Sequence, residues 1–168
     1  MKCRPKRKTR SEKEKEEKNQ IEEILRRNKD IGVEETTNEK GRAVIAKKDF
    51  KKGDPIVEYT GELLALKEAK MREADYARRG VGDSYMYFFK FKENNYCIDA
   101  TKDDGRLARL VNHSALSPNC GTKVVWFDGK PRLMLYAKKD ISERSEVLFD
   151  YGERRKHVVE DFPWLTTS

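Results

Sequence analysis

The sequence is poor in the residues that build metal sites and disulfide scaffolds. It holds three cysteines and two histidines, namely Cys3, Cys97, Cys120, His113 and His157. An odd number of cysteines with no Cys-x-x-Cys pair argues against a disulfide framework and a zinc knuckle, and fits a reducing compartment. Two histidines are too few for a histidine-rich metal site. We therefore expect no metal.

Long apolar runs and the common enzyme motifs are also missing. No stretch approaches the roughly 20 apolar residues that span a bilayer, and the Lys/Arg-rich start has no apolar signal core. The sequence has no Gly-x-Gly-x-x-Gly, Walker loop, Gly-x-Ser-x-Gly or His-Glu-x-x-His. A serine hydrolase would need His113 as its base, and no nucleophile elbow accompanies it.

Charge is abundant and unevenly placed. The net charge is +7, and residues 1–30 carry 12 Lys/Arg against 7 Asp/Glu. The first ten residues hold six basic side chains and no acid. The pattern indicates a basic arm, residues 1–10, on a nearly neutral domain. Such an arm suits a protein that approaches polyanions, and a solubilising or nuclear-import tail is the alternative.

Few helices are predicted. Ser11 and Glu14 fit a capping box for a helix over 12–27, whose apolar stripe is narrow enough for a surface position and which Gly32 ends. Residues 65–79 predict an internal helix that Gly80 stops. A short helix is expected over 105–111 and a closing one over 154–161.

Short strands fill most of the remaining chain. They are expected at 43–46, 56–59, 84–91, 96–99, 122–127, 132–137 and 146–149, with turns at 93–95 and at Asp128-Gly129. Many short strands with few helices predict a β-dominated α+β domain of several small sheets. Composition and periodicity lead no further.

Three segments carry a more specific signal. Asn112-His113-Ser114 is followed by Ser117-Pro118-Asn119-Cys120, Phe149-Asp150-Tyr151-Gly152 lies about 35 residues further on, and Lys40-Gly41-Arg42 opens the first strand. In this order and spacing the sequence resembles the SET-domain protein lysine methyltransferases, from about Lys40 to the C-terminus. The resemblance implies the SET fold, or β-clip: short curved sheets around a C-terminal pseudoknot that brings Asn112-His113 beside Tyr151.

One branch of that family is particularly similar, the branch that monomethylates lysine 20 of histone H4. The matching segments are 57–61, 85–87, 96–101, 106–110 and the tail Pro163-Trp164-Leu165. The cysteine-rich zinc-binding segment that ends most SET enzymes is missing. The implied organisation is a helix and linker over 11–38, the SET domain over 39–153, and a helix and tail over 154–168 that close the cofactor site.

The resemblance implies S-adenosylmethionine as cofactor and assigns residues to it. The cofactor contacts would be Lys40, Gly41, Arg42, Tyr85, Asn112, His113 and Trp164. The catalytic tyrosines would be Tyr151 and Tyr59, and the lysine channel would be lined by Ser84, Phe88 and Phe149. Arg109 is expected to shape the loop before Asn112, and Cys120 to be a buried thiol.

The implied reaction is direct displacement by a neutral lysine amine. Lysine titrates near pH ~10.4, and an apolar channel beside a positive sulfonium disfavours the ammonium. The implied partners are the histone H4 tail, the nucleosome and, through the arm, DNA, with a nuclear location on chromatin and a monomeric state. A methyltransferase for a non-histone protein and an inactive chromatin-binding scaffold are the alternatives.

Four positions depart from the branch. Phe149 stands where the branch carries tyrosine, Ser84 where it carries cysteine, Phe88 where it carries tyrosine, and Glu153 where it carries aspartate. In the wider family a tyrosine at the position of Phe149 limits the space around the amine. We therefore expect product specificity that is less strictly mono.

Overall fold

The computed structural model describes residues 7–82, 84–114 and 116–150. The elements are α1 (Arg10–Arg27), β1 (Val33–Asn38), β2 (Gly41–Ala46), β3 (Pro55–Tyr59), β4 (Glu62–Ala65), α2 (Leu66–Arg79), β5 (Met86–Phe91), β6 (Asn94–Asp99), the 3₁₀ helix η1 (Ala108–Leu110), β7 (Asn112–His113), β8 (Cys120–Phe127), β9 (Lys130–Ala137) and β10 (Leu148–Phe149). The closing helix expected over 154–161 lies outside the described residues.

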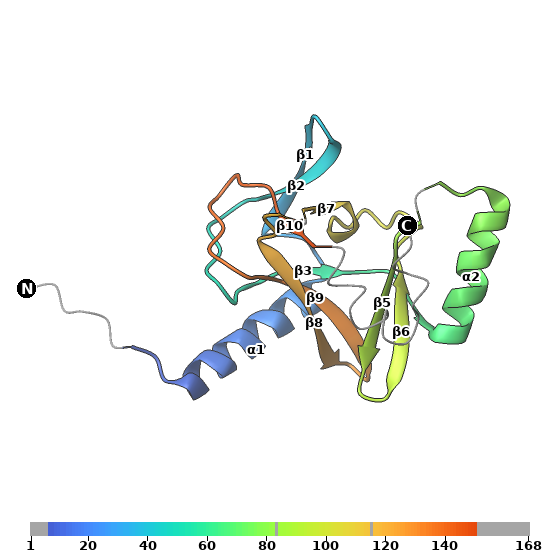
Figure 1. Ribbon diagram of the computed structural model, residues 1–168. Helices are drawn as coiled ribbons and strands as arrows, with labels where there is room; N and C mark the ends of the chain where they lie inside the picture. The colour runs from blue at the N-terminus through green and yellow to red at the C-terminus, as the bar shows by residue number, and fades with distance from the viewer. Residues whose placement is uncertain (1–6, 83, 115, 151–168) are drawn as a thin grey trace, which may run out of the picture.

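Three small sheets form the body of the molecule. Their strand orders are β1-β2, β3-β9-β8-β10-β7 and β4-β6-β5. Figure 1 shows α1 below the central sheet and α2 on the outer side of the β4-β6-β5 sheet. The predicted β-dominated α+β class is confirmed. No helix in the described part of the chain is both long and apolar enough to cross a membrane.

Two distant segments meet at the edge of the central sheet. Strand β10 lies between β7 and β8 and pairs with both in parallel, with Phe149 opposite His113 on one side and Cys120 on the other. Parallel neighbours need a long connection, and here the whole β8–β9 hairpin supplies it. Asn112-His113 and Leu148-Phe149 therefore lie side by side. Tyr151, which the resemblance places beside Asn112-His113, lies outside the described residues.

Helix α1 begins earlier than predicted. Its capping box is Thr9 with Glu12: the Glu12 amide donates to Thr9 Oγ1 at 3.3 Å, and the Thr9 amide donates to a Glu12 carboxylate oxygen at 2.7 Å. The prediction of Ser11 with Glu14 is wrong. Both pairs fit the pattern, and starting two residues earlier leaves Glu14 free to pair with Arg10 at 2.8 Å.

The end of α1 also differs from the prediction. The helix ends at Arg27, capped by Asn28 in the left-handed conformation at φ 50°, and not at Gly32. Asparagine tolerates that conformation better than most residues. Leu25 is the only residue of the helix that is buried, so the predicted surface position is correct.

Of the two predicted hairpin turns, the one between β8 and β9 is confirmed and the one between β5 and β6 is shifted. Asp128 and Gly129, at φ 51° and 76°, join β8 to β9 as predicted. The turn expected over 93–95 lies instead at Lys92-Glu93, with Lys92 at φ 55°, because Asn94 already pairs with Phe91 in β6. Strands β1, β4 and β7 were not predicted, since β1 is polar and β7 has only two residues.

The core lies between the three sheets. Its largest fully enclosed side chains include Phe50, Leu64, Leu133, Met134 and Leu135. Cys97 and Cys120 are completely buried, and the expectation of a buried thiol at Cys120 is confirmed. Both thiols thus belong to the packed interior.

Candidate functional site

The ends of several strands enclose a cavity of about 570 Å³. It is lined by Lys40, Arg42, Tyr59, Gly82, Ser84, Tyr85, Arg109, Leu110, Asn112 and Phe149. Seven of these were predicted site residues: Lys40, Arg42, Tyr59, Ser84, Tyr85, Asn112 and Phe149. The fold therefore brings residues from five separate segments to one hollow.

Aromatic side chains form the deep wall of this cavity. Tyr59 and Phe149 are almost completely buried, at 2% and 3% exposure, and Tyr85 is half-buried. The Tyr59 hydroxyl donates to the Tyr85 carbonyl at 3.4 Å. Ser84, beside them, is exposed. An aromatic wall with an accessible rim can receive a long cationic or amine-bearing side chain.

Tyr87 supports this wall and was missed from the sequence. Its ring lies 5.4 Å from that of Tyr59 and 6.4 Å from that of Phe149 between centroids. Its hydroxyl is 2.8 Å from Thr122 Oγ1. Strand alternation could have found it, because Tyr85, Tyr87 and Phe89 follow every second position.

Phe88 points the other way. It packs with the cluster of Leu64, Met86 and Cys97 against α2, and Lys70 Nζ lies 4.7 Å from its ring centre. The assignment of Phe88 to the channel was therefore wrong, because adjacent residues of a strand face opposite sides of a sheet.

Asn112 ties the first strands to the last. Its side-chain amide donates to the Arg42 carbonyl at 3.1 Å and to a Glu146 carboxylate oxygen at 2.9 Å. His113, its neighbour, is exposed and outside the cavity lining, with Nδ1 3.8 Å from an Asp150 oxygen. Asn112 thus fixes the cavity wall that β2 and β7 share.

The turn from β1 to β2 forms the rim. Gly41 has φ 97°, a backbone conformation that residues with a side chain rarely adopt. A Cβ atom built at this position would meet nothing within 4 Å. The Lys40 amide donates to Asn38 Oδ1 at 2.8 Å, and Arg42 pairs with Glu35. The turn geometry requires glycine and leaves the backbone at Gly41 open to a ligand.

Arg109 holds Tyr85 in place. Its guanidinium donates to the carbonyls of Ala100 and Thr101 at 2.9 and 3.1 Å, pairs with Asp103 at 3.1 Å, and lies 4.5 Å from the centre of the Tyr85 ring. This agrees with the structural role expected of Arg109.

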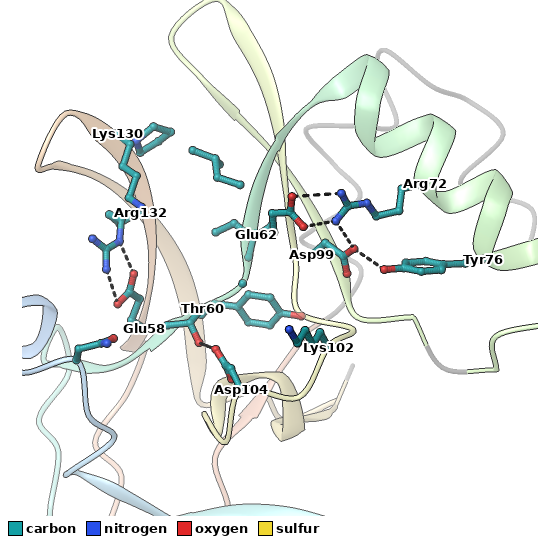
Figure 2. Close-up of a pocket in the computed structure, with 16 residues that line it drawn as sticks. Glu58, Thr60, Glu62, Arg72, Tyr76, Asp99, Lys102, Asp104, Lys130 and Arg132 are labelled. Atoms are coloured by element: carbon teal, nitrogen blue, oxygen red, sulfur yellow. Dashed lines mark hydrogen bonds and ion pairs between the residues drawn. The ribbon is translucent and has the colours of Figure 1, made fainter.

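A second cavity, of about 550 Å³, shares Tyr59 with the first. We call it the charged cavity, and the first one the aromatic cavity. Figure 2 shows the polar contacts of its lining: the ion pair of Arg132 with Glu58 at 2.5 and 3.0 Å, and the hydrogen bond from Thr60 to Asp104 at 2.8 Å. These contacts hold the residues on either side of Tyr59.

Asp99 is the centre of the other group in Figure 2. Its buried carboxylate accepts from Tyr76 at 2.7 Å and pairs at 3.2 Å with Arg72, which also pairs with Glu62. Burial alone would raise the pKa of Asp99, but hydrogen bonds from Thr101, Tyr76 and Arg72 outweigh it and hold the pKa below its ordinary value. The group joins α2 to the sheet.

The Asp99 group also reaches the aromatic cavity. The Thr101 amide donates to Asp99 at 2.9 Å, and the Tyr85 amide donates to Thr101 Oγ1 at 3.0 Å. Tyr151 and Trp164, predicted for catalysis and for the cofactor, lie outside the described residues. Within the described ranges, no three His, Cys, Asp or Glu side chains are grouped to hold a metal ion.

Comparison with known proteins gives consistent matches. The SET domain family model matches residues 41–152. N-lysine methyltransferase KMT5A-A of Xenopus laevis is 45% identical over 163 residues, which are 96% of this chain and 48% of that protein. Histone-lysine N-methyltransferase Set8 of Drosophila melanogaster is 47% identical over 126 residues, 75% of this chain and 18% of that protein.

A solved structure agrees with these matches. The crystal structure of CpSET8 from Cryptosporidium has a TM-score of 0.75 and 37% identity, and the match covers 90% of this chain and 69% of that one. The chain spans about half the length of the Xenopus relative. The family match includes every strand that lines the aromatic cavity, and the chain belongs to the SET-domain family.

Proposed function

We propose that the chain is an S-adenosylmethionine-dependent protein lysine methyltransferase that acts on lysine 20 of histone H4 in nucleosomes. The observation that carries the proposal is the aromatic cavity, where Tyr59, Tyr85, Asn112 and Phe149 converge from separate segments of the chain. The names of the relatives, an N-lysine methyltransferase and a histone-lysine N-methyltransferase, support the same reaction class. The histone H4 site comes from the resemblance to one branch.

The residues of the cavity fit the cofactor. Among the residues that the structure describes, its lining includes the cations Lys40, Arg42 and Arg109 and no carboxylate, which suits the carboxylate end of an amino-acid cofactor. The open backbone at Gly41 allows close approach. The other residues that would hold the cofactor are Asn112 and Tyr85 and, by resemblance, His113 and Trp164. When bound, S-adenosylmethionine supplies an electrophilic methyl group.

The chain's own residues prepare the lysine. The apolar rings of Tyr59 and Phe149 exclude water, which favours the neutral amine over the ammonium. A nearly buried Tyr59 hydroxyl and the carbonyl that it contacts can orient that amine. Tyr151 takes the second orienting role in the proposal. Ser84, exposed beside the wall, would stand near the channel mouth.

Product specificity follows from Phe149. Its ring carries no hydroxyl, so it cannot hold a water beside the amine by a hydrogen bond. The space that such a water would fill is left for a methyl group. We propose that the enzyme adds one methyl group and also a second. The basic arm, residues 1–10, would add nonspecific phosphate affinity, and the protein would act as a nuclear monomer on chromatin.

Radiolabelled methyl transfer to nucleosomes and to free core histones tests the activity. Transfer to histone H4 is expected for the wild type, and near loss of transfer for Tyr151→Phe. A histone H4 peptide in which the target lysine is replaced by arginine should accept no label. Label on that peptide would refute the assignment of the lysine.

Two alternatives make different predictions in the same assay. A methyltransferase for a non-histone protein would bind S-adenosylmethionine and leave all core histones unlabelled. An inactive scaffold would bind nucleosomes and transfer no methyl group to any protein.

A further inference from the structure

Two loops on the face away from α2 repeat a short motif. Ala46-Lys47-Lys48-Asp49 follows β2, and Ala137-Lys138-Lys139-Asp140 follows β9. Figure 1 shows the two loops, teal and orange, next to each other on the side opposite α2. We call residues 46–54 and 137–144 the twin loops.

The twin loops are joined by reciprocal contacts. Phe50 and Ile141 exchange backbone hydrogen bonds of 2.8 and 2.9 Å. Asp49 accepts from the Glu143 amide at 2.8 Å, and Asp140 accepts from the Lys52 amide at 2.9 Å. Each aspartate therefore caps the backbone of the opposite loop, three residues beyond that loop's own aspartate.

This arrangement separates the charges. The twin loops contain seven cations and four carboxylates. The carboxylates of Asp49, Asp54 and Asp140 accept from backbone amides, so they are held against the main chain. Six of the cations are exposed: Lys47, Lys48, Lys51, Lys52, Lys139 and Arg144. Asp49, Asp140 and Glu143 are exposed as well, so the six exposed cations exceed the exposed carboxylates by three.

The few contacts that these cations make leave them accessible. Lys51 lies 3.3 Å from Asp140, a pair exposed enough to be screened by solvent. Lys139 Nζ lies 3.2 Å from Ser117 Oγ. None of the twin-loop residues lines the aromatic cavity, so the cations are not needed to hold the cofactor.

We propose that the twin loops bind the phosphate backbone of double-stranded DNA. Lysines act as point charges toward phosphates and need no shaped pocket. An acidic protein partner fits less well, because protein interfaces depend on apolar anchors. None of the large exposed apolar residues among the described ones belongs to the twin loops. Two are their neighbours: Ile31 shares a cavity with Lys48, and Leu116 precedes Ser117, which contacts Lys139.

This inference extends the proposed function, since it names a second surface that would hold the enzyme on nucleosomes. It differs from the basic arm, residues 1–10, in which α1 begins. Because DNA binding needs neither cofactor nor substrate, it can be measured whether or not methyl transfer occurs.

The test is a salt titration of binding to a labelled DNA duplex, read by fluorescence anisotropy. The triple variant Lys47→Gln, Lys52→Gln, Lys139→Gln removes three exposed cations of the twin loops. The matched control, Lys29→Gln, Lys67→Gln, Lys90→Gln, removes three exposed lysines elsewhere. Both variants carry the same net charge, and thermal unfolding should show both to be folded.

Each lost phosphate contact lowers the slope of log affinity against log salt by about 0.9. For the twin-loop variant, the magnitude of this slope should fall by roughly 2 to 3. The variant should also bind DNA at least about 10-fold more weakly at low salt. The control should keep the wild-type slope. Equal slopes for the two variants would overturn the proposal, whether both fall or neither does.

Two further measurements distinguish DNA binding from binding to acidic protein and from the methyl transfer itself. If the twin-loop variant loses affinity for polyglutamate but keeps the wild-type DNA slope, the surface binds acidic protein and the proposal fails. The twin-loop variant should retain transfer to a free histone H4 peptide and lose transfer to nucleosomes. If the wild type transfers no methyl group at all, the proposed function fails while the DNA titration still decides the role of the loops.

Discussion

The two cavities that share Tyr59 differ in how their polar groups are used. In the charged cavity, four carboxylates and four cations line one hollow, and each carboxylate has a partner within it or beside it. The described lining of the aromatic cavity has three cations and no carboxylate. Two of those cations, Arg42 and Arg109, pair with acids outside the lining.

This difference separates a structural role from a binding role. Where each carboxylate already has a partner, a ligand would gain little binding energy from it, and removing one partner should lower stability. Where aromatic rings and an open backbone line the space, removing a side chain should cost binding and transfer. Substitutions on the two sides of Tyr59 should therefore give different kinds of loss.

The largest stability loss is expected from Arg132→Ala. It leaves the Glu58 carboxylate, 2% exposed, without its ion-pair partner, at a cost of about 3–5 kcal/mol. Urea denaturation measures it. Arg10→Ala, which removes an exposed pair with Glu14, should cost under about 0.5 kcal/mol. Equal costs for the two variants would show that the charged cavity is not structural.

Among substitutions at the described residues, Asn112→Ala should give the largest loss of function. It removes the amide that links β7 to the Arg42 carbonyl, and a displacement of about 1 Å in a site can cost about 10²-fold in rate. We expect about a 10²-fold fall in methyl transfer with weaker cofactor binding and little change in thermal unfolding. Asn94→Ala, in the exposed β5–β6 hairpin, is the control. Wild-type cofactor affinity in Asn112→Ala would contradict the assignment.

Asp99→Asn should give a pH-dependent stability loss. The depressed pKa of Asp99 means that its carboxylate stabilises the fold above the unfolded pKa of about 3.9. That stabilisation is lost as the pH falls through the lower folded pKa. We expect a loss of about 1–3 kcal/mol at pH ~7, shrinking below pH ~4. If the difference in stability between wild type and Asp99→Asn is the same at every pH, the charge of Asp99 is not its source.

Phe149→Tyr should change the product more than the rate. The added hydroxyl would restrict the space beside the amine, so any dimethyl product should disappear while the first transfer persists. Mass spectrometry of a histone H4 peptide, with enzyme and cofactor in excess, checks this. Strict monomethylation by the wild type under those conditions would sink the idea that Phe149 relaxes specificity.

Among the variants near the aromatic cavity, a small effect is expected from Tyr87→Phe. It removes a hydroxyl contact to Thr122 and should cost about 0.5–1.5 kcal/mol. Because the ring remains against Tyr59 and Phe149, transfer should fall only a few-fold. Thr122→Val should match it, and the double variant should cost no more than either. Additive costs would show that the two hydroxyls act separately.

Motifs with fixed spacing predicted which residues meet at the aromatic cavity better than local patterns predicted the helices and strands. The segments at Lys40, Asn112 and Phe149 all reached the aromatic cavity. The strand pattern failed at β1, which is polar, and at β7, which is two residues long. A strand that is held by its neighbours needs no apolar alternation of its own.

By itself, the sequence determined the family, the β-dominated class and most of the cavity residues, because glycine, asparagine and aromatic side chains stand at fixed intervals. Only the tertiary structure decided which face of β5 turns toward the cavity wall, placing Tyr87 against Tyr59 and Phe149 and Phe88 against α2. It also decided that Asp49 and Asp140 cap each other's loops. Such contacts join residues about 90 positions apart, and their geometry depends on how the strands pair.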